Sequence, residues 1–222
     1  MKKFRLFSMM LCISACLIFT TSCDDDTEKP KDEPTESLNF KIEVNVEDGK
    51  DYDIDKVKAL LEEETEIASV DYNNGIFVIE IPETAMKDQK LMNITDIIFY
   101  VPSEVTISEP NAKGTYLSIL GYKDDEEVGE IWHHKYTDTR NTDATFIYVD
   151  RDLTITGSVD AENNGETYIE KYNLDLKKGW NIMYVIYSES TLATYETTTT
   201  PQSGMKWYFE DSSSYLDWDF GK

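Results

Sequence analysis

Apolar and polar residues alternate at the start of the folded part of this chain. Between Leu38 and Val46 every second residue is apolar, and the residues in between are asparagine, lysine and glutamate. A period of two is typical of a strand with one buried and one wet face. Glu47, Asp48 and Gly49 then interrupt the pattern. We therefore predict a half-buried strand over 38–46.

The next part of the chain contains one ambiguous segment and one strong turn signal. Apolar residues in 54–64 fit both the spacing of a helix and the alternation of a strand. Asn73-Asn74-Gly75 separates two apolar runs at 67–72 and 76–81. Asn-Gly accepts positive φ at both central positions of a tight turn, so these runs are predicted to form a hairpin. After Pro82, residues 83–93 predict a short helix.

The second half of the chain repeats short strand patterns separated by turn residues. Strands are predicted at 115–122, 128–135, 145–149, 153–159, 168–176, 182–187 and 206–209. The run at 182–187 is apolar throughout, which is typical of a strand covered on both faces. Regular short strands with turn signals indicate an all-β fold with minor helix, built as an antiparallel β-sandwich. A division near Glu109-Pro110-Asn111 would give a β-domain at 38–108 and a sandwich at 109–222; one continuous sandwich is the alternative.

The first residues have the order of an export signal. Lys2, Lys3 and Arg5 precede an apolar stretch at 6–19, and small residues follow it up to Cys23. This order resembles the bacterial lipoprotein signal, which implies that 1–22 is removed and that Cys23 is lipidated. Cys16, after Ile13-Ser14-Ala15, is a competing lipidation site, and an uncleaved N-terminal anchor is a further alternative.

Residues 23–37 are predicted to be an acidic linker between the lipid and the folded part. They are rich in aspartate, glutamate, lysine, proline and threonine, and they contain no large apolar residue. The simplest interpretation is that the linker is a solvated spacer. The run Asp24-Asp25-Asp26 directly after Cys23 also resembles the surface-export signal of Bacteroidetes lipoproteins, which implies an outer-membrane protein displayed on the cell surface.

Motifs in the folded part resemble the same group of lipoproteins. The matching segments are Glu66-Ile67-Ala68-Ser69, Asn74-Gly75, Ile81-Pro82-Glu83-Thr84, Tyr148-Val149-Asp150-Arg151-Asp152-Leu153-Thr154-Ile155-Thr156-Gly157, Leu176-Lys177-Lys178-Gly179-Trp180-Asn181 and Met205-Lys206-Trp207-Tyr208-Phe209. The resemblance covers much of the chain beyond the signal. It brings no assigned activity, so the function has to be argued from the residues.

Charge and cysteine content exclude several functions. The chain has 44 acidic and 21 basic residues and a net charge of −23, which repels phosphate backbones and argues against nucleic acid as a partner. Its attachment to a membrane is therefore expected to depend on the lipid anchor. All three cysteines lie at positions 12, 16 and 23, so the folded part is expected to contain no disulfide.

The sequence offers only weak candidates for catalytic or metal-binding residues. His133 and His134 are the only histidines and, as neighbours on a strand, point to opposite faces; we expect one packed and one exposed. Gly-x-Ser-x-Gly is absent. Asp124–Glu127 and Asp150-x-Asp152 offer oxygen ligands for Ca²⁺ but not the spaced loop that it prefers, which favours solvated turns. We expect no enzyme, no cofactor and no metal site.

The tryptophans are the most promising ligand-binding residues. Candidates are Trp132, Trp180, Trp207 and Trp218. Exposed rings stack on sugars or anchor protein partners, although Trp180 and Trp207 also fit positions in a core. The sequence thus predicts a lipid-anchored envelope protein that binds a glycan or a protein without catalysing a reaction. A β-barrel carrier of a small apolar ligand and a structural subunit of a surface complex are the alternatives.

Overall fold

The computed structural model describes residues 39–62, 64–98, 101–163 and 165–212. They belong to one compact unit, which spans 37–222. The predicted signal, Cys16, Cys23, the acidic linker and Trp218 lie outside the described residues. None of the helices in the described part is long and apolar enough to cross a membrane.

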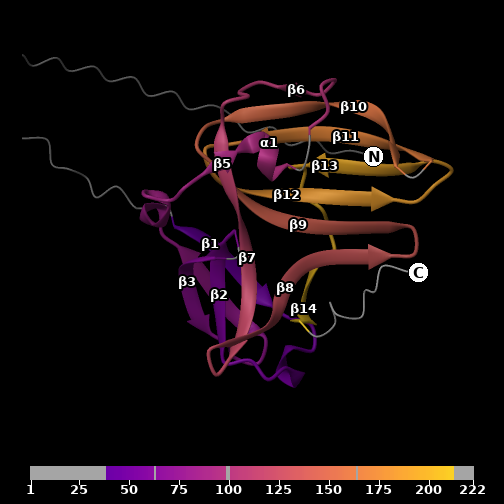
Figure 1. Cartoon of the computed structure of the whole chain (residues 1–222). Helices are drawn as coiled ribbons and strands as arrows, with labels where there is room; N and C mark the ends of the chain where they lie inside the picture. Colours follow the sequence, from indigo (N-terminus) through magenta and orange to yellow (C-terminus); the bar gives the residue numbers. More distant parts are fainter. Residues whose placement is uncertain (1–38, 63, 99–100, 164, 213–222) are drawn as a thin grey trace, which may run out of the picture. The chain divides into compact units, whose positions relative to one another are not determined.

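Strands make up most of the described chain, which confirms the all-β prediction with minor helix (Figure 1). The strands are β1 (Phe40–Asn45), β2 (Lys56–Leu61), β3 (Thr65–Asp71), β4 (Ile76–Ile81), β5 (Met92–Asn93), β6 (Thr106–Ile107), β7 (Lys113–Lys123), β8 (Glu126–Thr137), β9 (Arg140–Val149), β10 (Leu153–Asn163), β11 (Glu166–Leu176), β12 (Gly179–Ser188), β13 (Ala193–Thr198) and β14 (Lys206–Asp211). Short 3₁₀ turns at Gly49–Asp51 and Glu83–Met86 and one helical turn, α1 (Ile94–Ile97), complete the list. The predicted helix at 83–93 is therefore only a 3₁₀ turn at its start.

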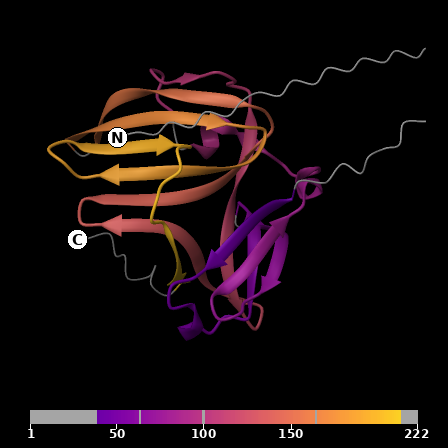
Figure 2. The same cartoon turned by 180° about the vertical axis from the view of Figure 1, so that it is seen from behind.

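The strands form two sheets among the described residues. β1 and β4 pair as a small antiparallel sheet. The long sheet has 12 strands in the order β3-β2-β7-β8-β9-β12-β13-β11-β10-β6, with β14 added on β8 and β5 on β7. From behind, β10, β11, β13, β12 and β9 again lie side by side (Figure 2). The order is open, with β3 at one end and β6 at the other.

One hydrophobic core lies between the small sheet and one face of the long sheet, which we call the outer face. The predicted alternation in β1 is confirmed, because Ile42 and Val44 are buried while the residues between them are exposed. The same core takes up residues from five strands of the long sheet, including Val57, Ile131, Phe146 and Trp207. β2 thus forms a strand rather than a helix. Its bulge between Ala59 and Leu60 lets consecutive residues be buried.

A second core lies on the opposite, inner face of the long sheet. Ile147 and Val149 of β9 and Met183 of β12 face it, together with residues of β10, β11 and the α1 region. Ile94, in α1, is fully buried there. Strands on both sides of residue 109 share the long sheet, since β2 pairs with β7 along six residue pairs. Each half of the chain therefore contributes to both cores.

The turn at Asn73-Asn74-Gly75 does not form the predicted hairpin. β3 pairs with β2, whereas β4 pairs with β1, so the turn connects the long sheet to the small one. Only an isolated bridge joins Asn73 to Ile76. Gly75 makes this crossing possible, because its φ is +89° and its backbone lies against Gly49. A side chain at Gly49 would come within 2.4 Å of the Gly75 Cα atom.

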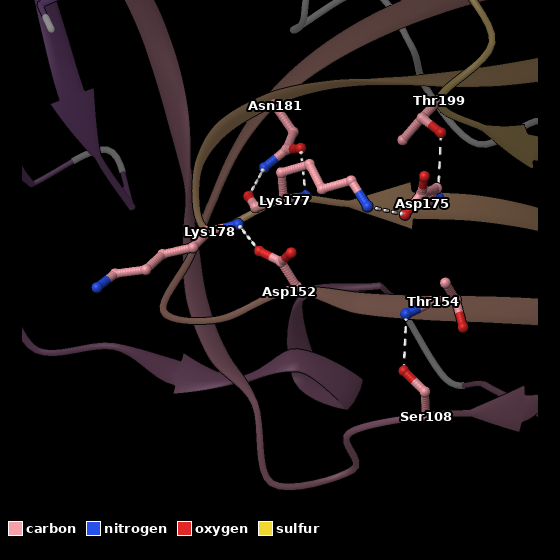
Figure 3. A network of polar contacts seen from close by, with 8 residues as sticks. All are labelled: Ser108, Asp152, Thr154, Asp175, Lys177, Lys178, Asn181 and Thr199. Atoms are coloured by element: carbon pink, nitrogen blue, oxygen red, sulfur yellow. Dashed lines mark hydrogen bonds and ion pairs between the residues drawn. The ribbon is translucent and has the colours of Figure 1, made fainter. Parts of the chain in front are cut away.

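Side chains hold the end of the long sheet where β11 turns into β12 (Figure 3). The Asn181 amide donates to the Lys177 carbonyl at 2.7 Å and accepts from the Lys177 backbone N–H at 2.9 Å. The Lys178 N–H donates to Asp152 at 2.8 Å, which ties the turn to the start of β10. These contacts fix the start of β12, the strand that carries Met183 and Val185 to the site described next.

Candidate functional site

Three neighbouring strands separate at one point of the long sheet. β7 pairs with β9 from Gly114 to Leu117, but with β8 only from Leu120 onward. β8 in turn joins β9 only from His133 onward. The strands diverge between these ladders, which leaves Trp132 and Thr145 at the centre of a fork. Pairing of β8 with β14 continues on the other side of β8.

A pocket of about 310 Å³ opens at this fork; we call it the fork pocket. Its apolar wall includes Ile97 of α1 and Met183 and Val185 of β12. Trp132 of β8 provides an aromatic wall, and its side chain is half-buried. Polar groups come from Ser118 and Glu130 of β7 and β8 and from Thr145 of β9. An apolar pocket with a few converging polar groups is the usual form of a site for a small ligand.

The alternation of β8 decides which residues reach the pocket. Trp132 and His134 point to the inner face, whereas His133 points to the outer face and stacks on Trp207 with ring centroids 4.4 Å apart. His134 is buried against Tyr136 and Tyr208, at 4.0 and 4.4 Å between ring centroids. The expectation of one packed and one exposed histidine is therefore wrong, because both rings pack against aromatic neighbours.

The charge state next to the pocket is set by burial. Burial lowers the pKa of His134, although Asp143 and Glu210 act in the opposite direction. Burial raises the pKa of Asp143, and this rise is reduced by a hydrogen bond of 3.0 Å that the Tyr136 hydroxyl donates to it. His134 Nδ1 lies 4.0 Å from Asp143 Oδ1, too far for a hydrogen bond. The imidazole of His134 is thus neutral at pH 7.

The three predicted tryptophans within the described residues do not come together. Trp132 is the one that lines the fork pocket. Trp207 is buried in the core on the outer face and stacks on Phe146. Trp180 packs against the same core, where its ring stacks on Phe40 at 5.4 Å. Trp207, Phe146, Phe40 and Trp180 thus form a row of aromatic contacts that holds the small sheet on the long one.

The acidic residues that the sequence offers as Ca²⁺ ligands have structural roles in turns. Asp124 and Asp125 both have positive φ and form the two-residue turn between β7 and β8. Asp150 pairs with Arg151 and accepts a hydrogen bond from the Lys113 backbone. In the described ranges no three histidine, cysteine, aspartate or glutamate side chains lie together as a metal-binding group.

Most of the pocket could not be found from the sequence. Met183 and Val185 belong to the apolar run that predicts a strand covered on both faces. This prediction is confirmed, because Tyr184 and Ile186 are buried on the outer face while Met183 is buried in the inner core, with Val185 packed against it. Ser118 and Thr145 are ordinary strand residues, and only the fork in the pairing brings them beside Trp132. The lone signal in the sequence was Trp132 itself.

Comparison with known protein families, curated proteins and solved structures finds no match to this chain. Its class is therefore defined by the structure alone: an all-β, sandwich-like protein with a mainly apolar pocket at a fork of its long sheet.

Proposed function

We propose that this protein is a lipid-anchored, surface-exposed protein of the outer membrane that binds a glycan and catalyses no reaction. The observation that carries the proposal is Trp132, a half-buried indole that forms one wall of the fork pocket. Trp207 is buried in the core, Trp180 packs at the edge of that core and lines a separate hollow of about 390 Å³, and Trp218 lies outside the described residues. Trp132 is the indole that lies in the fork pocket, beside its converging polar groups.

A sugar ring fits the chemistry of the pocket. One face of such a ring exposes C–H groups, which pack on an indole, while its hydroxyls need hydrogen-bond partners at the edge. Ser118, Thr145 and Glu130 lie along the same pocket and carry suitable oxygen atoms. A volume of about 310 Å³ is at the lower end of the range for ligand pockets, roughly 300–1,000 Å³. One or two sugar units of a longer chain would be held, with the rest outside.

The attachment to the membrane is argued from the sequence. Cys23 follows a signal-like segment, and an acidic linker separates it from β1. We expect palmitate labelling and mass spectrometry of the mature N-terminus to place the lipid on Cys23. Cys23→Ala should lose both the label and the membrane fraction, while Cys16→Ala keeps them; the reverse would move the site to Cys16.

The glycan proposal is tested by binding measurements on the purified full-length chain in detergent. A glycan array identifies the ligand, and calorimetry then measures its affinity. Trp132→Ala should weaken binding roughly thirtyfold, the effect of losing a central aromatic contact worth about 2 kcal/mol. Trp180→Ala is the matched control, because it removes an indole from the outer face. Equal affinity of both variants, or no glycan bound by the parent, contradicts the proposal.

The apolar wall of the pocket supports a second candidate, a carrier of a small apolar ligand. Ile97, Met183 and Val185 would cover such a ligand without any hydrogen bond. The neutral fluorescent probe N-phenyl-1-naphthylamine tests this reading. Bright, saturable fluorescence that Val185→Asp removes favours the carrier, particularly if no glycan competes with the probe. Fluorescence that a glycan displaces favours the first proposal.

A further inference from the structure

A second hollow lies on the inner face of the long sheet, away from the fork. Tyr168 of β11, Tyr187 of β12 and Tyr195 of β13 line it; we call it the tyrosine hollow, and it has a volume of about 280 Å³. The three strands are neighbours in the order β12-β13-β11, which places the tyrosines side by side. Tyr187 is directly opposite Tyr195 in the register.

The three rings form an angled wall. Tyr195 contacts Tyr168 with centroids 5.3 Å apart and planes at 74°, and it contacts Tyr187 at 5.0 Å and 45°. Tyr195 stays 42% exposed, although two other aromatic rings touch it. Rings that meet at such angles present their faces and edges to one shared space. All three rings line the hollow, so a group in it contacts aromatic surface from three strands.

The charge of the hollow is negative. Glu166 and Glu170 are among the residues that line it, and none of the lining residues is basic. The Tyr172 hydroxyl donates a hydrogen bond of 3.0 Å to Glu170, which fixes the carboxylate beside the rings. Burial raises the pKa of Tyr187, and the nearby charges of Glu189 and, to a smaller extent, Glu166 raise it further. Glu166 thus has an electrostatic effect on one ring of the hollow.

Aromatic faces and carboxylates together attract one kind of ligand. Cations within about 6 Å of a ring centroid are drawn to the negative π face, and tertiary or quaternary ammonium groups lose little hydration on entry. Anions are repelled by the two glutamates, and neutral apolar groups gain nothing from them. We propose that the tyrosine hollow is a binding site for a small organic cation that carries a methylated ammonium group, distinct from the fork pocket.

The experiment uses tetramethylammonium chloride and choline as probes, with calorimetry on the purified full-length chain in low salt. Both cations should bind, and 3,3-dimethyl-1-butanol, the neutral shape analogue of choline, should bind at least about tenfold more weakly. Choline should bind more tightly than phosphocholine, because the phosphate meets Glu166 and Glu170. Equal binding of the neutral analogue, or no binding of either cation, overturns the proposal.

Substitutions test the aromatic rings and the carboxylates of the tyrosine hollow one at a time. Tyr195→Leu removes a π face and should weaken choline binding roughly tenfold, while Tyr195→Phe should keep it. Glu166→Gln should weaken it severalfold and reduce its dependence on salt. Tyr136→Leu is the control, because Tyr136 is an exposed tyrosine that does not line the hollow. Trp132→Ala should leave choline binding unchanged, so failure of the glycan proposal and failure of this one are distinguishable. Unchanged binding by Tyr195→Leu contradicts the site.

Discussion

At the scale of single residues, identical side chains have different roles because of the face on which they lie. Trp132 and Trp207 are both indoles on paired strands, and Trp207 lies one register position away from Trp132. That single step sends Trp207 into the core and Trp132 into the fork pocket. His133 and His134 divide in the same way. The sequence shows the alternation but does not show which face is covered.

The two histidines make stability depend on pH. Burial lowers the pKa of both imidazoles below the ordinary 6.5. The unfolded chain therefore takes up protons first as the pH falls through about 6.5, and the folded state loses stability in that range. Asp143 has the opposite effect on stability, because burial raises the pKa of its carboxyl group. This shift stabilises the folded state at pH values below the ordinary pKa of 3.8, and the contribution is lost as the pH rises through the raised pKa.

Urea unfolding at pH 8 and pH 5.5 checks this. The free energy of unfolding should be lower at pH 5.5 than at pH 8, because the unfolded chain binds the protons that the buried imidazoles resist. His134→Gln should reduce this difference, whereas Lys135→Gln, a change at the exposed neighbour, should leave it intact. A parent protein that is as stable at pH 5.5 as at pH 8 would contradict the argument.

At the scale of elements, most strand patterns were predicted correctly, whereas the helix at 83–93 and one pair of strand partners were not. The strand β1, the Asp124-Asp125 turn and the strand β12 follow from alternation, turn chemistry and an apolar run. The hairpin predicted around 73–75 was wrong, because a tight turn fixes only its own geometry; β3 pairs with β2 instead, and β4 pairs with β1. The fork between β7, β8 and β9 depends on pairings between distant residues, which no local pattern encodes. The fork pocket could not be predicted for the same reason.

The turn that joins the two sheets gives a sharp test of packing. Gly75→Ala places a Cβ atom within 2.8 Å of the Gly49 Cα atom and keeps an unfavourable φ of +89°. Gly165→Ala is the matched control, because its φ of +84° is similar and nothing lies within 4 Å of the added atom. Gly165→Ala should cost about 1 kcal/mol of unfolding free energy from strain alone, and Gly75→Ala about 3 kcal/mol. Chemical denaturation measures both, and equal losses would contradict the close approach of the two turns.

At the scale of the whole molecule, negative charge is the dominant long-range property. Acidic residues outnumber basic ones by 44 to 21. Ion pairs such as Lys41–Glu43 and Lys177–Asp175 lie at the surface, where solvent screens them and they add little stability. Repulsion among the unpaired carboxylates acts over the entire surface and opposes the compact state. The same charge makes both proposed sites unsuited to anionic ligands, since Glu130 lines one and Glu166 and Glu170 line the other.

Added salt screens this repulsion and should therefore stabilise the folded protein. Raising the salt concentration from 20 to 500 mM shortens the Debye length from about 20 Å to about 4 Å and weakens repulsion over long distances more than short ion pairs. We expect Tm to rise by roughly 2–4 °C, the shift that about 1 kcal/mol produces at this chain length. Calorimetry in NaCl and in KCl should give the same rise, since screening does not depend on which cation is used. A fall in Tm would mean that the surface ion pairs outweigh the repulsion, and a rise in one salt alone would indicate a bound cation.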